Sequence, residues 1–485
     1  MNIKAYILTA IMAITATAQA QESNSAYFLE DMTARHDLNP AFGNSSSYFA
    51  IPALGSVNIK MQGNFGIQDI LFKDPQTGKY KRTFMHPDIP YSEALSGFSK
   101  GINKVTADAS ITLLSAGFNA FGGYNTVEIR GKTTIGLRAP YELFEFAKDL
   151  KNQNYRFDDI HSKGQSYVSV GFGHSRQITD KLRVGAKLNV LLGMANVDVS
   201  IEGLRADLVG DKWVMTSDKA EANVNIKGIQ FNNKTSEYDF RNGNYEYVNL
   251  GDIDIDGFGI GGYGLGLDLG AEYQIQEGLK VSGALLDIGF ISWKDTHTLR
   301  QRSSSFIFDG FHELKIKNET TQPGEILDDQ FNNYSDQMSD FLRLTDVGNT
   351  GGKTTVLGAT MNVAGQYTLP SYQQLTLGLM AQHRFNGDLS WTEGRLSANW
   401  SPLDWLNGGV NFAVSDLATS VGWVLNFHPK GYNFFIGMDH AFCKLSKDLI
   451  PLSSNTQLSI GMSITWNKKS SESKRKEETQ EELFW

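Results

Sequence analysis

Long stretches of this chain alternate between apolar and small or polar residues, and this period of two constrains the fold more than any other feature. In residues 263–275 every second residue is large or apolar, and the residues between are glycine or polar. Residues 458–466 repeat the pattern. Successive side chains of a strand point to opposite faces, so each stretch predicts a strand with one apolar and one polar face. In a soluble sandwich the apolar face packs inward, whereas in an outer-membrane barrel it meets lipid and the lumen is polar.

The N-terminus favours the membrane alternative. Lys4 precedes an apolar run over residues 5–18, and Ala18-Gln19-Ala20 fits the small-x-small cleavage pattern of a signal peptide. We therefore expect residues 1–20 to be a cleaved signal peptide, with Gln21 first in the exported protein. No cysteine follows the apolar run, so lipoprotein processing is not expected. The predicted location is the outer membrane of a Gram-negative bacterium, with outer-membrane lipid and the barrel-assembly machinery as partners.

Composition excludes several classes of protein. The chain has 485 residues, and the net charge of −9 argues against nucleic-acid binding. Its one cysteine, Cys443, allows no internal disulfide. After the signal peptide no apolar run reaches the roughly 18 residues of a transmembrane helix. If this chain crosses a membrane, it crosses with strands.

Candidate strands recur with turn-forming clusters between them. The clearest stripes lie at 56–66, 107–117, 124–138, 165–177, 181–190, 220–231, 257–275, 279–293 and 357–367, followed by closely spaced hairpins between 375 and 466. A barrel with both ends in the periplasm needs an even number of strands. The predicted fold class is all-β, a closed antiparallel transmembrane β-barrel of about 14 strands (alternative 16) with short helices in loops. The barrel is assigned to residues 57–467.

Two groups of residues fit such a barrel. Lys181, Arg183 and Lys187 alternate with apolar residues, and a lipid-facing cation at the midplane costs about 2–4 kcal/mol, so they should face the lumen or lie near a rim. Tryptophans near strand ends are read as interfacial belts; they are Trp293, Trp391, Trp400, Trp405, Trp423 and Trp466.

Other stretches break the strand rhythm. Residues 140–153, beginning with Pro140, predict a short amphipathic helix. Residues 204–256 and 310–352 predict long surface loops, and residues 468–485 a charged periplasmic tail. Trp466 closes the last alternating strand and is the candidate barrel-assembly signal, with the terminal Phe484-Trp485 pair as its rival.

Motifs of soluble chemistry are weak. Residues 252–257 resemble half of a calcium loop, but Tyr263 stands where a bidentate glutamate is needed, so an acidic strand end is preferred. Ser99 lies in a Gly-x-Ser-x-Gly pattern without the strand and helix that a nucleophile elbow requires. The histidines show no zinc spacing. We expect no catalytic residue, metal or cofactor, and no enzyme activity.

The segment that follows the signal peptide carries a resemblance. It contains Tyr27-Phe28-Leu29-Glu30, then His36-Asp37-Leu38-Asn39-Pro40-Ala41-Phe42, then residues 48–55 with the sequence Tyr-Phe-Ala-Ile-Pro-Ala-Leu-Gly. Asn39-Pro40-Ala41 resembles the Asn-Pro-Ala element of the FadL/PorV group of outer-membrane barrels. The longer block is similar to an uncharacterised barrel family of Bacteroidota.

The resemblance implies a role for this segment. FadL-type barrels have 14 strands and an N-terminal hatch and move hydrophobic ligands, whereas PorV-type barrels serve a secretion system. Residues 21–56 would be the hatch, with Asn39, Pro40, Ala41 and Phe42 as ligand or hatch residues; alternatively this is only the turn that starts the barrel. The leading functional hypothesis is a transporter or channel for small hydrophobic ligands gated by this segment. The alternative is a non-transporting barrel that scaffolds a secretion or surface-assembly complex with a protein partner.

Overall fold

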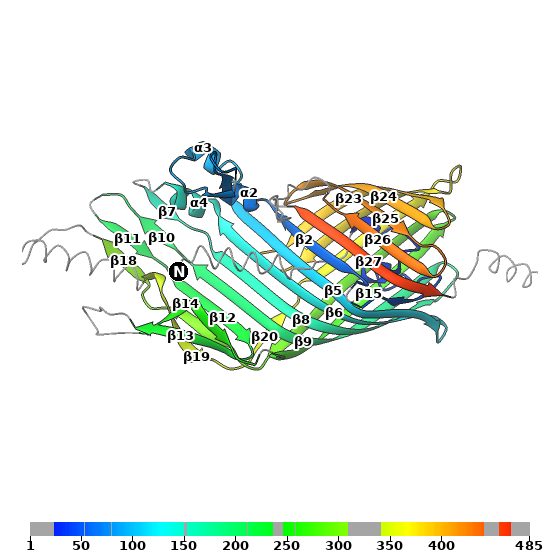
Figure 1. Ribbon diagram of the computed structural model, residues 1–485, viewed down its shortest axis with the longest axis horizontal. Coiled ribbons are helices and arrows are strands. Elements are labelled where there is room, and N and C mark those ends of the chain that lie inside the picture. Colours follow the sequence, from blue (N-terminus) through cyan, green and yellow to red (C-terminus); the bar gives the residue numbers. More distant parts are fainter. Residues whose placement is uncertain are drawn as a thin grey trace, which may run out of the picture.

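In the computed structural model the chain forms a closed antiparallel β-barrel of 14 strands (Figure 1). The structure describes residues 24–52, 54–78, 80–149, 153–210, 212–235, 246–257, 259–308, 341–440 and 455–466. In ring order the strands are β2 (Val57–Gly63), β5 (Ile102–Ala120), β6 (Gly123–Pro140), β8 (Ile160–Gln177), β9 (Leu182–Glu202), β15 (Gly262–Gln276), β16 (Leu279–Trp293), β21 (Ala359–Thr368), β22 (Leu375–Phe385), β23 (Trp391–Leu403), β24 (Leu406–Ser415), β25 (Thr419–Phe427), β26 (Tyr432–Met438) and β27 (Thr456–Trp466). The pairing of β27 with β2 closes the ring and confirms the predicted fold class. Among the described residues, no helix is both long and apolar enough to cross a membrane.

The first strand of the wall is interrupted. β1 (Ser47–Ala50) and β2 both pair with β27 on one side and with β5 on the other, so they occupy one strand position. Between them, residues 51–52 and 54–56 belong to no strand, and Leu54 is half exposed. The ladder is partly restored there, because Ile51 N–H donates to the Met462 carbonyl at 3.1 Å and Met462 N–H donates to the Leu54 carbonyl at 2.8 Å. The barrel therefore closes at a seam whose first strand position is interrupted.

Alternation along each strand separates a lipid face from a lumen face. On β15 the outward residues run from Tyr263 through Leu265, Leu267 and Leu269 to Tyr273, each at least 37% exposed. Ten residues at about 3.3 Å each, tilted by about 40°, span roughly 25 Å between the two tyrosines, the height of an outer-membrane apolar band. Inward positions are mostly polar and buried.

Two tryptophans were placed wrongly from the sequence. Trp400, Trp405 and Trp466 are about half exposed on the outside, as interfacial belts require. Trp293 and Trp391 instead face inward and are 1% and 2% exposed. Both stand at an inward position of their strand, and the parity of a residue within its strand, not its nearness to the strand end, decides the face.

The two ends of the barrel differ in their connections. At one end, strands are joined by short turns such as residues 121–122, 277–278 and 404–405. Short turns lie on the periplasmic side of outer-membrane barrels, so this end is taken as periplasmic. Long connections lie at the other end, on the left in Figure 1.

The long-loop end carries further strands and short helices. α2 (Ile67–Ile70), α3 (Tyr91–Ala94) and α4 (Tyr141–Lys148) enclose an aromatic cluster that includes Phe98 stacked on Phe144 at 4.0 Å. α4 begins after Pro140, as predicted, and ends earlier than expected. The remaining strands are β3 (Leu71–Lys73), β4 (Tyr80–Thr83), β7 (Asn154–Arg156), β10 (Arg205–Asp207), β11 (Trp213–Thr216), β12 (Lys219–Ile226), β13 (Ile229–Thr235), β14 (Glu246–Ile255), β17 (His297–Gln301), β18 (Ser305–Phe308), β19 (Leu344–Asn349) and β20 (Lys353–Val356).

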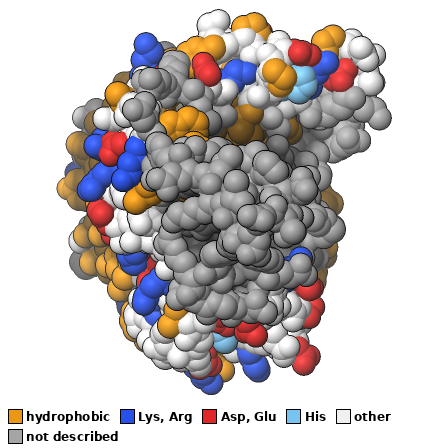
Figure 2. Space-filling view, turned by 90° about the vertical axis from the view of Figure 1, so that its left-hand side faces the viewer, with side chains coloured by type: hydrophobic (Ala, Val, Ile, Leu, Met, Phe, Trp, Pro, Cys, Tyr) orange, Lys and Arg blue, Asp and Glu red, His pale blue; other side chains and the backbone are white. Residues whose placement is uncertain are grey.

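These strands replace much of the predicted loop structure. β12 pairs with the far end of β9, so residues 219–226 extend the sheet beyond the barrel and are not one of the 14 wall strands. Strands β18, β11, β10 and β7 form a separate four-stranded sheet. Figure 2 looks onto this end, where acidic and basic side chains are mixed around the rim and hydrophobic side chains follow the flank.

One wall residue has an unusual backbone. Asp287 on β16 has φ of 56°, in the left-handed region, at a shift of register between β15 and β16. Its N–H donates to the Asp268 carboxylate at 2.6 Å, and its own carboxylate accepts from Lys132 at 2.7 Å. The left-handed backbone of a non-glycine residue costs about 1–2 kcal/mol, which the surrounding contacts must offset. This bulge places an aspartate in the lumen.

Candidate functional site: a segment docked in the lumen

The described chain begins inside the barrel, and residues 24–46, called here the lumen segment, stay there until β1 enters the wall. The segment contains two short 3-10 helices, η1 (Asn24–Ala26) and η2 (Thr33–Asp37). The N–H groups of Asn24 and Ser25 donate to the two carboxylate oxygens of Asp439 at 2.9 and 2.8 Å. Arg395 on β23 donates to the same carboxylate at 3.1 Å. A buried ion pair near the ends of β23 and β26 thus holds the deep end of the lumen segment.

An apolar core fixes the middle of the lumen segment. Tyr27 packs edge-on against Phe28 and Phe42, with ring centroids 5.2 and 5.1 Å apart. The remaining segment members of this buried cluster are Ala26, Leu29, Met32, Ala34 and Leu38, and its wall members are Ala364, Met380, Val424 and Phe435. The four wall residues come from β21, β22, β25 and β26, whose inward faces are otherwise polar. The segment therefore covers four apolar wall residues, called here the apolar patch, which form two pairs separated by β23 and β24 in a polar lumen.

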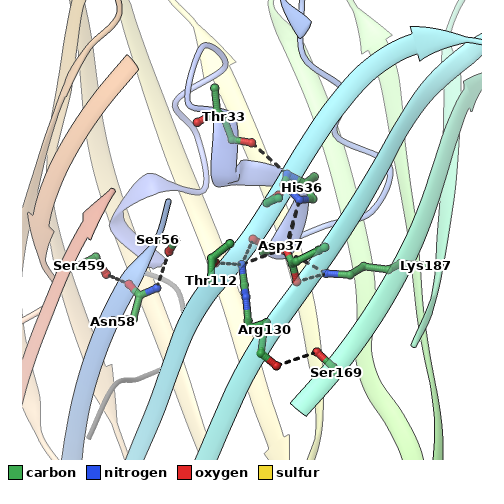
Figure 3. A network of polar contacts seen from close by, with 12 residues as sticks. Thr33, His36, Asp37, Ser56, Asn58, Thr112, Arg130, Ser169, Lys187 and Ser459 are labelled. Atoms are coloured by element: carbon green, nitrogen blue, oxygen red, sulfur yellow. Dashed lines mark hydrogen bonds and ion pairs between the residues drawn. The ribbon is translucent and has the colours of Figure 1, made fainter. Parts of the chain in front are cut away.

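A buried charge cluster fixes the other side of the lumen segment (Figure 3). Asp37 of the segment and Glu128 of β6 share two cations. Lys187 of β9 is 3.0 Å from Asp37 and 2.9 Å from Glu128, and Arg130 of β6 pairs with both carboxylates. The His36 ring lies 3.5 Å from Asp37 and 3.6 Å from Glu128. Lys187 thus faces the lumen as predicted, and it does so as a partner of the segment.

The cluster resembles a metal site only in its residue types. Ligand atoms of His36, Asp37 and Glu128 lie within 4.8 Å of one another, and in the described part of the chain they are the one such group. Yet Arg130 and Lys187 already neutralise both carboxylates at ion-pair distance. A divalent cation would have to displace two buried cations, so the arrangement fits an ion-pair network rather than a metal centre.

The Asn39-Pro40-Ala41-Phe42 element is a turn pressed against the wall. The Asn39 carboxamide oxygen accepts from Ala41 N–H at 2.9 Å, an Asx turn. Its amide group donates to the carbonyls of Gly283 on β16 and Ala271 on β15 at 3.2 and 3.3 Å.

Glycine permits this close approach. A Cβ at Gly270 would overlap the Asn39 side chain, and one at Gly185 would overlap the Pro40 carbonyl. Ala41 is fully buried and Phe42 is 4% exposed, with Arg35 stacked 3.8 Å from its ring centroid. The four predicted residues therefore lie together in the lumen, and a role in ligand binding stays a prediction.

In the lumen segment, neighbouring charges shift the pKa values of His36 and Glu30. Burial lowers the pKa of His36, but the carboxylates of Asp37 and Glu128 outweigh it and raise that pKa above the usual value. Burial raises the pKa of Glu30, but Lys280 and Arg35 more than offset it and lower that pKa to about 2. Because 54% of the Glu30 side chain is exposed, its 2.6 Å ion pair with Lys280 is screened and stabilises the docked segment little.

Cavities remain on both sides of the lumen segment. At the short-turn end are cavities of about 540 and 330 Å³ that share Asp31 as a lining residue. Deeper in, a cavity of about 60 Å³ lies beside Asp37, Asp287 and Arg384 and shares lining residues with one of about 20 Å³. A space of about 10 Å³ lies near the start of β6 and the end of β8. Of these cavities, the two widest lie at the short-turn end of the barrel.

The other residues singled out from the sequence are dispersed. Trp466 ends β27, pairs with Ser47 and lines the 330 Å³ cavity; its role in assembly stays a prediction. Ser99 is followed by strand β5 and not by a helix, so it forms no nucleophile elbow. Residues 252–255 lie within strand β14, as the acidic-strand interpretation had it. The predicted signal peptide, residues 21–23, Cys443 and the predicted tail lie outside the described residues.

Sequence reasoning missed the residues that hold the lumen segment. Glu128 and Arg130 on β6, and Glu393 and Arg395 on β23, are charged pairs at i and i+2, on the polar side of their strands. Glu393 and Arg395 are 2.6 Å apart and nearly inaccessible to water. Charges of opposite sign on the same face of a membrane strand were the available signal.

A family match covers most of the chain. Residues 40–439 match the family described as "Family of unknown function (DUF5723)". The chain belongs to this family. No curated protein matches the chain.

Solved structures of similar architecture are outer-membrane barrels. They include the toluene transporter TodX of Pseudomonas putida, with a TM-score of 0.38, 8% identity and coverage of 93% of this chain and 95% of that one. A FadL homologue of Pseudomonas aeruginosa has a TM-score of 0.37, 10% identity and coverage of 93% and 100%. The translocator domain of the autotransporter NalP from Neisseria meningitidis has a TM-score of 0.33, 8% identity and coverage of 95% and 98%.

These likenesses are too distant to carry an argument about ligand or mechanism. A FadL homologue is among the similar structures, and membership of the FadL/PorV group stays a prediction. The relation to a Bacteroidota family, and the Asn-Pro-Ala-Phe element as its mark, stay predictions.

Proposed function

We propose that this protein is an outer-membrane transporter or channel for a small hydrophobic ligand, and that residues 21–56 act as a hatch that gates the lumen. The observation that supports the proposal is the apolar patch of Ala364, Met380, Val424 and Phe435, which the lumen segment covers. A polar, water-filled lumen has no need of such a patch unless something apolar occupies it.

In this proposal the hatch and the ligand compete for one surface. Phe28 and Met32 occupy the patch in the closed state. When the hatch leaves, a ligand of similar size can bury the same surface, and burying one aromatic or aliphatic side chain contributes about 1.5–3 kcal/mol. A hydrophobic ligand would then favour the open state because only that state exposes its site.

Conductance tests the gate. The structure shows where to cut: removing residues 21–45 leaves β1 and its pairing with β27 intact, whereas a deletion to residue 56 would also remove a piece of the wall. In a planar bilayer we expect the intact protein to be nearly silent and the truncated one to conduct. If both are silent although both remain folded barrels by heat-modifiable electrophoresis, the gate is refuted.

Binding of a fluorescent hydrophobic probe, N-phenyl-1-naphthylamine, tests the ligand class. The truncated barrel should bind it more tightly than the intact one, and Met380→Gln in the truncated background should weaken that binding. Equal binding by all three proteins would refute the patch as the ligand site.

A scaffold function is the second candidate. Strands β7, β10, β11 and β18 build a sheet at the long-loop end, separate from the wall. Such a platform suits a protein partner of a secretion or surface-assembly complex. Silence of both barrels in the bilayer, together with a stable partner recovered by crosslinking through Trp213 or Phe308 replaced by a photoreactive residue, would favour it.

A further inference from the structure

A wide cavity lies between the lumen segment and the wall at the short-turn end. Its volume is about 540 Å³, within the range of pockets that take small-molecule ligands. Phe28 and Glu30 of the segment form one side, and Gln366, Thr376 and Asn399 of β21, β22 and β23 form the other. A molecule in this cavity would contact both the segment and the barrel.

The lining is rich in neutral groups that both donate and accept hydrogen bonds. Those that matter here are Gln366, Gln373, Thr376, Asn399, Ser401 and Asn407. The ion pair between Glu30 and Lys280 is internally neutral. The ring of Phe28 supplies one apolar surface. Amides, hydroxyls and one aromatic ring together match a ligand that carries several hydroxyl groups on a partly apolar frame.

One wall side chain has an unmet hydrogen bond. Asn399 is 3% exposed, and its amide group donates to Ser397 Oγ at 3.0 Å and more weakly to the Thr376 carbonyl at 3.4 Å. Its carboxamide oxygen has no partner. That oxygen occupies the space over Gly409, where a Cβ would meet it. A buried acceptor without a partner is unfavourable. If the Asn399 carboxamide turns away from Gly409, its oxygen can accept from a ligand hydroxyl or amide and gain a bond that the empty protein lacks.

An extended peptide fits less well. Peptides commonly bind by adding a strand to a free sheet edge, and a closed barrel offers none here. Asp31 and Glu277 also line the cavity, so an anionic ligand is disfavoured. Among uncharged ligands, one with hydroxyl and amide groups best matches the neutral donors and acceptors of the lining.

We propose that this cavity is a binding site for a small neutral saccharide bearing acetamido groups, reached from the periplasmic side. Carboxamide side chains hydrogen-bond sugar hydroxyls and acetamido groups in pairs, and the Phe28 ring packs against the apolar face of a sugar. This site is separate from the apolar patch and does not depend on transport.

The position of the site couples it to the lumen segment. Phe28 and Glu30 belong to the site only while the segment is docked. A saccharide that contacts them therefore binds the docked state better and stabilises it, and by linkage a tighter dock strengthens saccharide binding. The saccharide would act opposite to a hydrophobic ligand, which needs the segment displaced.

Calorimetry on the full-length barrel in detergent, with N,N′-diacetylchitobiose as the probe, tests the site. We expect saturable binding with a Kd of about 1 mM or tighter. Asn399→Leu removes the orphan acceptor at similar volume and should weaken binding about tenfold, and Thr376→Val should weaken it severalfold. Asn225→Leu is the matched control, a buried asparagine on β12 at the other end, and should leave binding unchanged.

A second measurement reports the coupling. The probe should slow thiol labelling of the lumen segment in an Ala34→Cys, Cys443→Ser variant. The proposal is overturned if the wild-type barrel does not bind the probe at about 10 mM or if both cavity variants bind it as tightly as wild type. It is also overturned if the labelling rate is the same with and without the probe. Binding of a cationic probe such as lysinamide in place of the saccharide would overturn the ligand class. If the full-length barrel binds the saccharide but the truncated barrel does not conduct, only the transport proposal is refuted.

Discussion

Replacing Phe28 with alanine should release the lumen segment while leaving the barrel folded. Phe28 is 4% exposed and lies directly over Gly378 of β22. Truncating a buried phenylalanine to alanine typically costs about 3–5 kcal/mol. Because Phe28 also borders the 540 Å³ cavity, water can enter the space it leaves, so we expect the lower end, about 3 kcal/mol. The undocked fraction should then rise about a hundredfold, since about 1.4 kcal/mol corresponds to a factor of ten.

Cysteine labelling measures that fraction. Ala34 is 7% exposed within the apolar core of the lumen segment, so Ala34→Cys in a Cys443→Ser background gives one reporter thiol. Reagent reaches it only when the segment undocks, and the labelling rate follows the undocked population. Phe28→Ala should raise the rate about a hundredfold, with unchanged heat-modifiable migration of the barrel.

The wall side of the same contact offers an independent check. A Cβ at Gly378 would overlap the Phe28 ring and approach Ser397 Oγ to 2.5 Å, so Gly378→Ala should also speed labelling, by about five- to a hundredfold for an overpacking cost of about 1–3 kcal/mol. Gly394→Ala meets nothing within 4 Å and should have no effect. Labelling rates for Phe28→Ala and Gly378→Ala that stay within about threefold of the parent would refute the apolar core as the main anchor.

Three further outcomes follow from the charged contacts. Asp37→Asn removes one carboxylate from the buried cations Lys187 and Arg130 and should weaken docking by about 3–5 kcal/mol. The expected readout is faster labelling of Ala34→Cys. The pKa of His36 is raised in the docked segment, so its protonation stabilises docking. This stabilisation is complete below the ordinary pKa of about 6.5 and is lost as pH rises through the docked pKa, so labelling should speed up from about pH 6 to about pH 9. His36→Gln should remove that part of the pH dependence. Asp287→Gly and Asp287→Ala both remove the ion-pair partner of Lys132, but only the alanine variant keeps the cost of a left-handed backbone at this position. The glycine variant should therefore be more stable in urea unfolding by about 1 kcal/mol. Equal stabilities of the two variants would contradict backbone strain at residue 287.

Alternation predicted the wall of this barrel because membrane strands have a lipid face that tolerates only apolar residues. Residues 263–275 and 279–293 appear as β15 and β16 almost unchanged. β12 was mistaken for a wall strand because β9 continues past the barrel and pairs with it there, and the local pattern is the same on either side of the membrane edge.

The contacts that hold the lumen segment were beyond the sequence pattern. Alternation predicts that Glu128 and Lys187 face the lumen, but it does not predict which lumen-facing residues contact each other. Asp37 contacts them from the lumen segment, which is not a strand and forms no strand pairing with the barrel wall. The docking partners depend on how the segment crosses the lumen, and a segment without periodicity does not encode its path locally.

The lumen segment is covalently continuous with the barrel wall, which it joins through β1 at the seam. Docking is therefore an intramolecular event with an effective concentration on the order of millimolar, and a free peptide of the same sequence would need about that concentration to close a truncated barrel. Released and fully extended, the 23 residues from Asn24 to Ser46 would reach about 80 Å from the seam. One stretch of chain can thus occupy the lumen or extend to a protein in the periplasm, but it cannot do both at once.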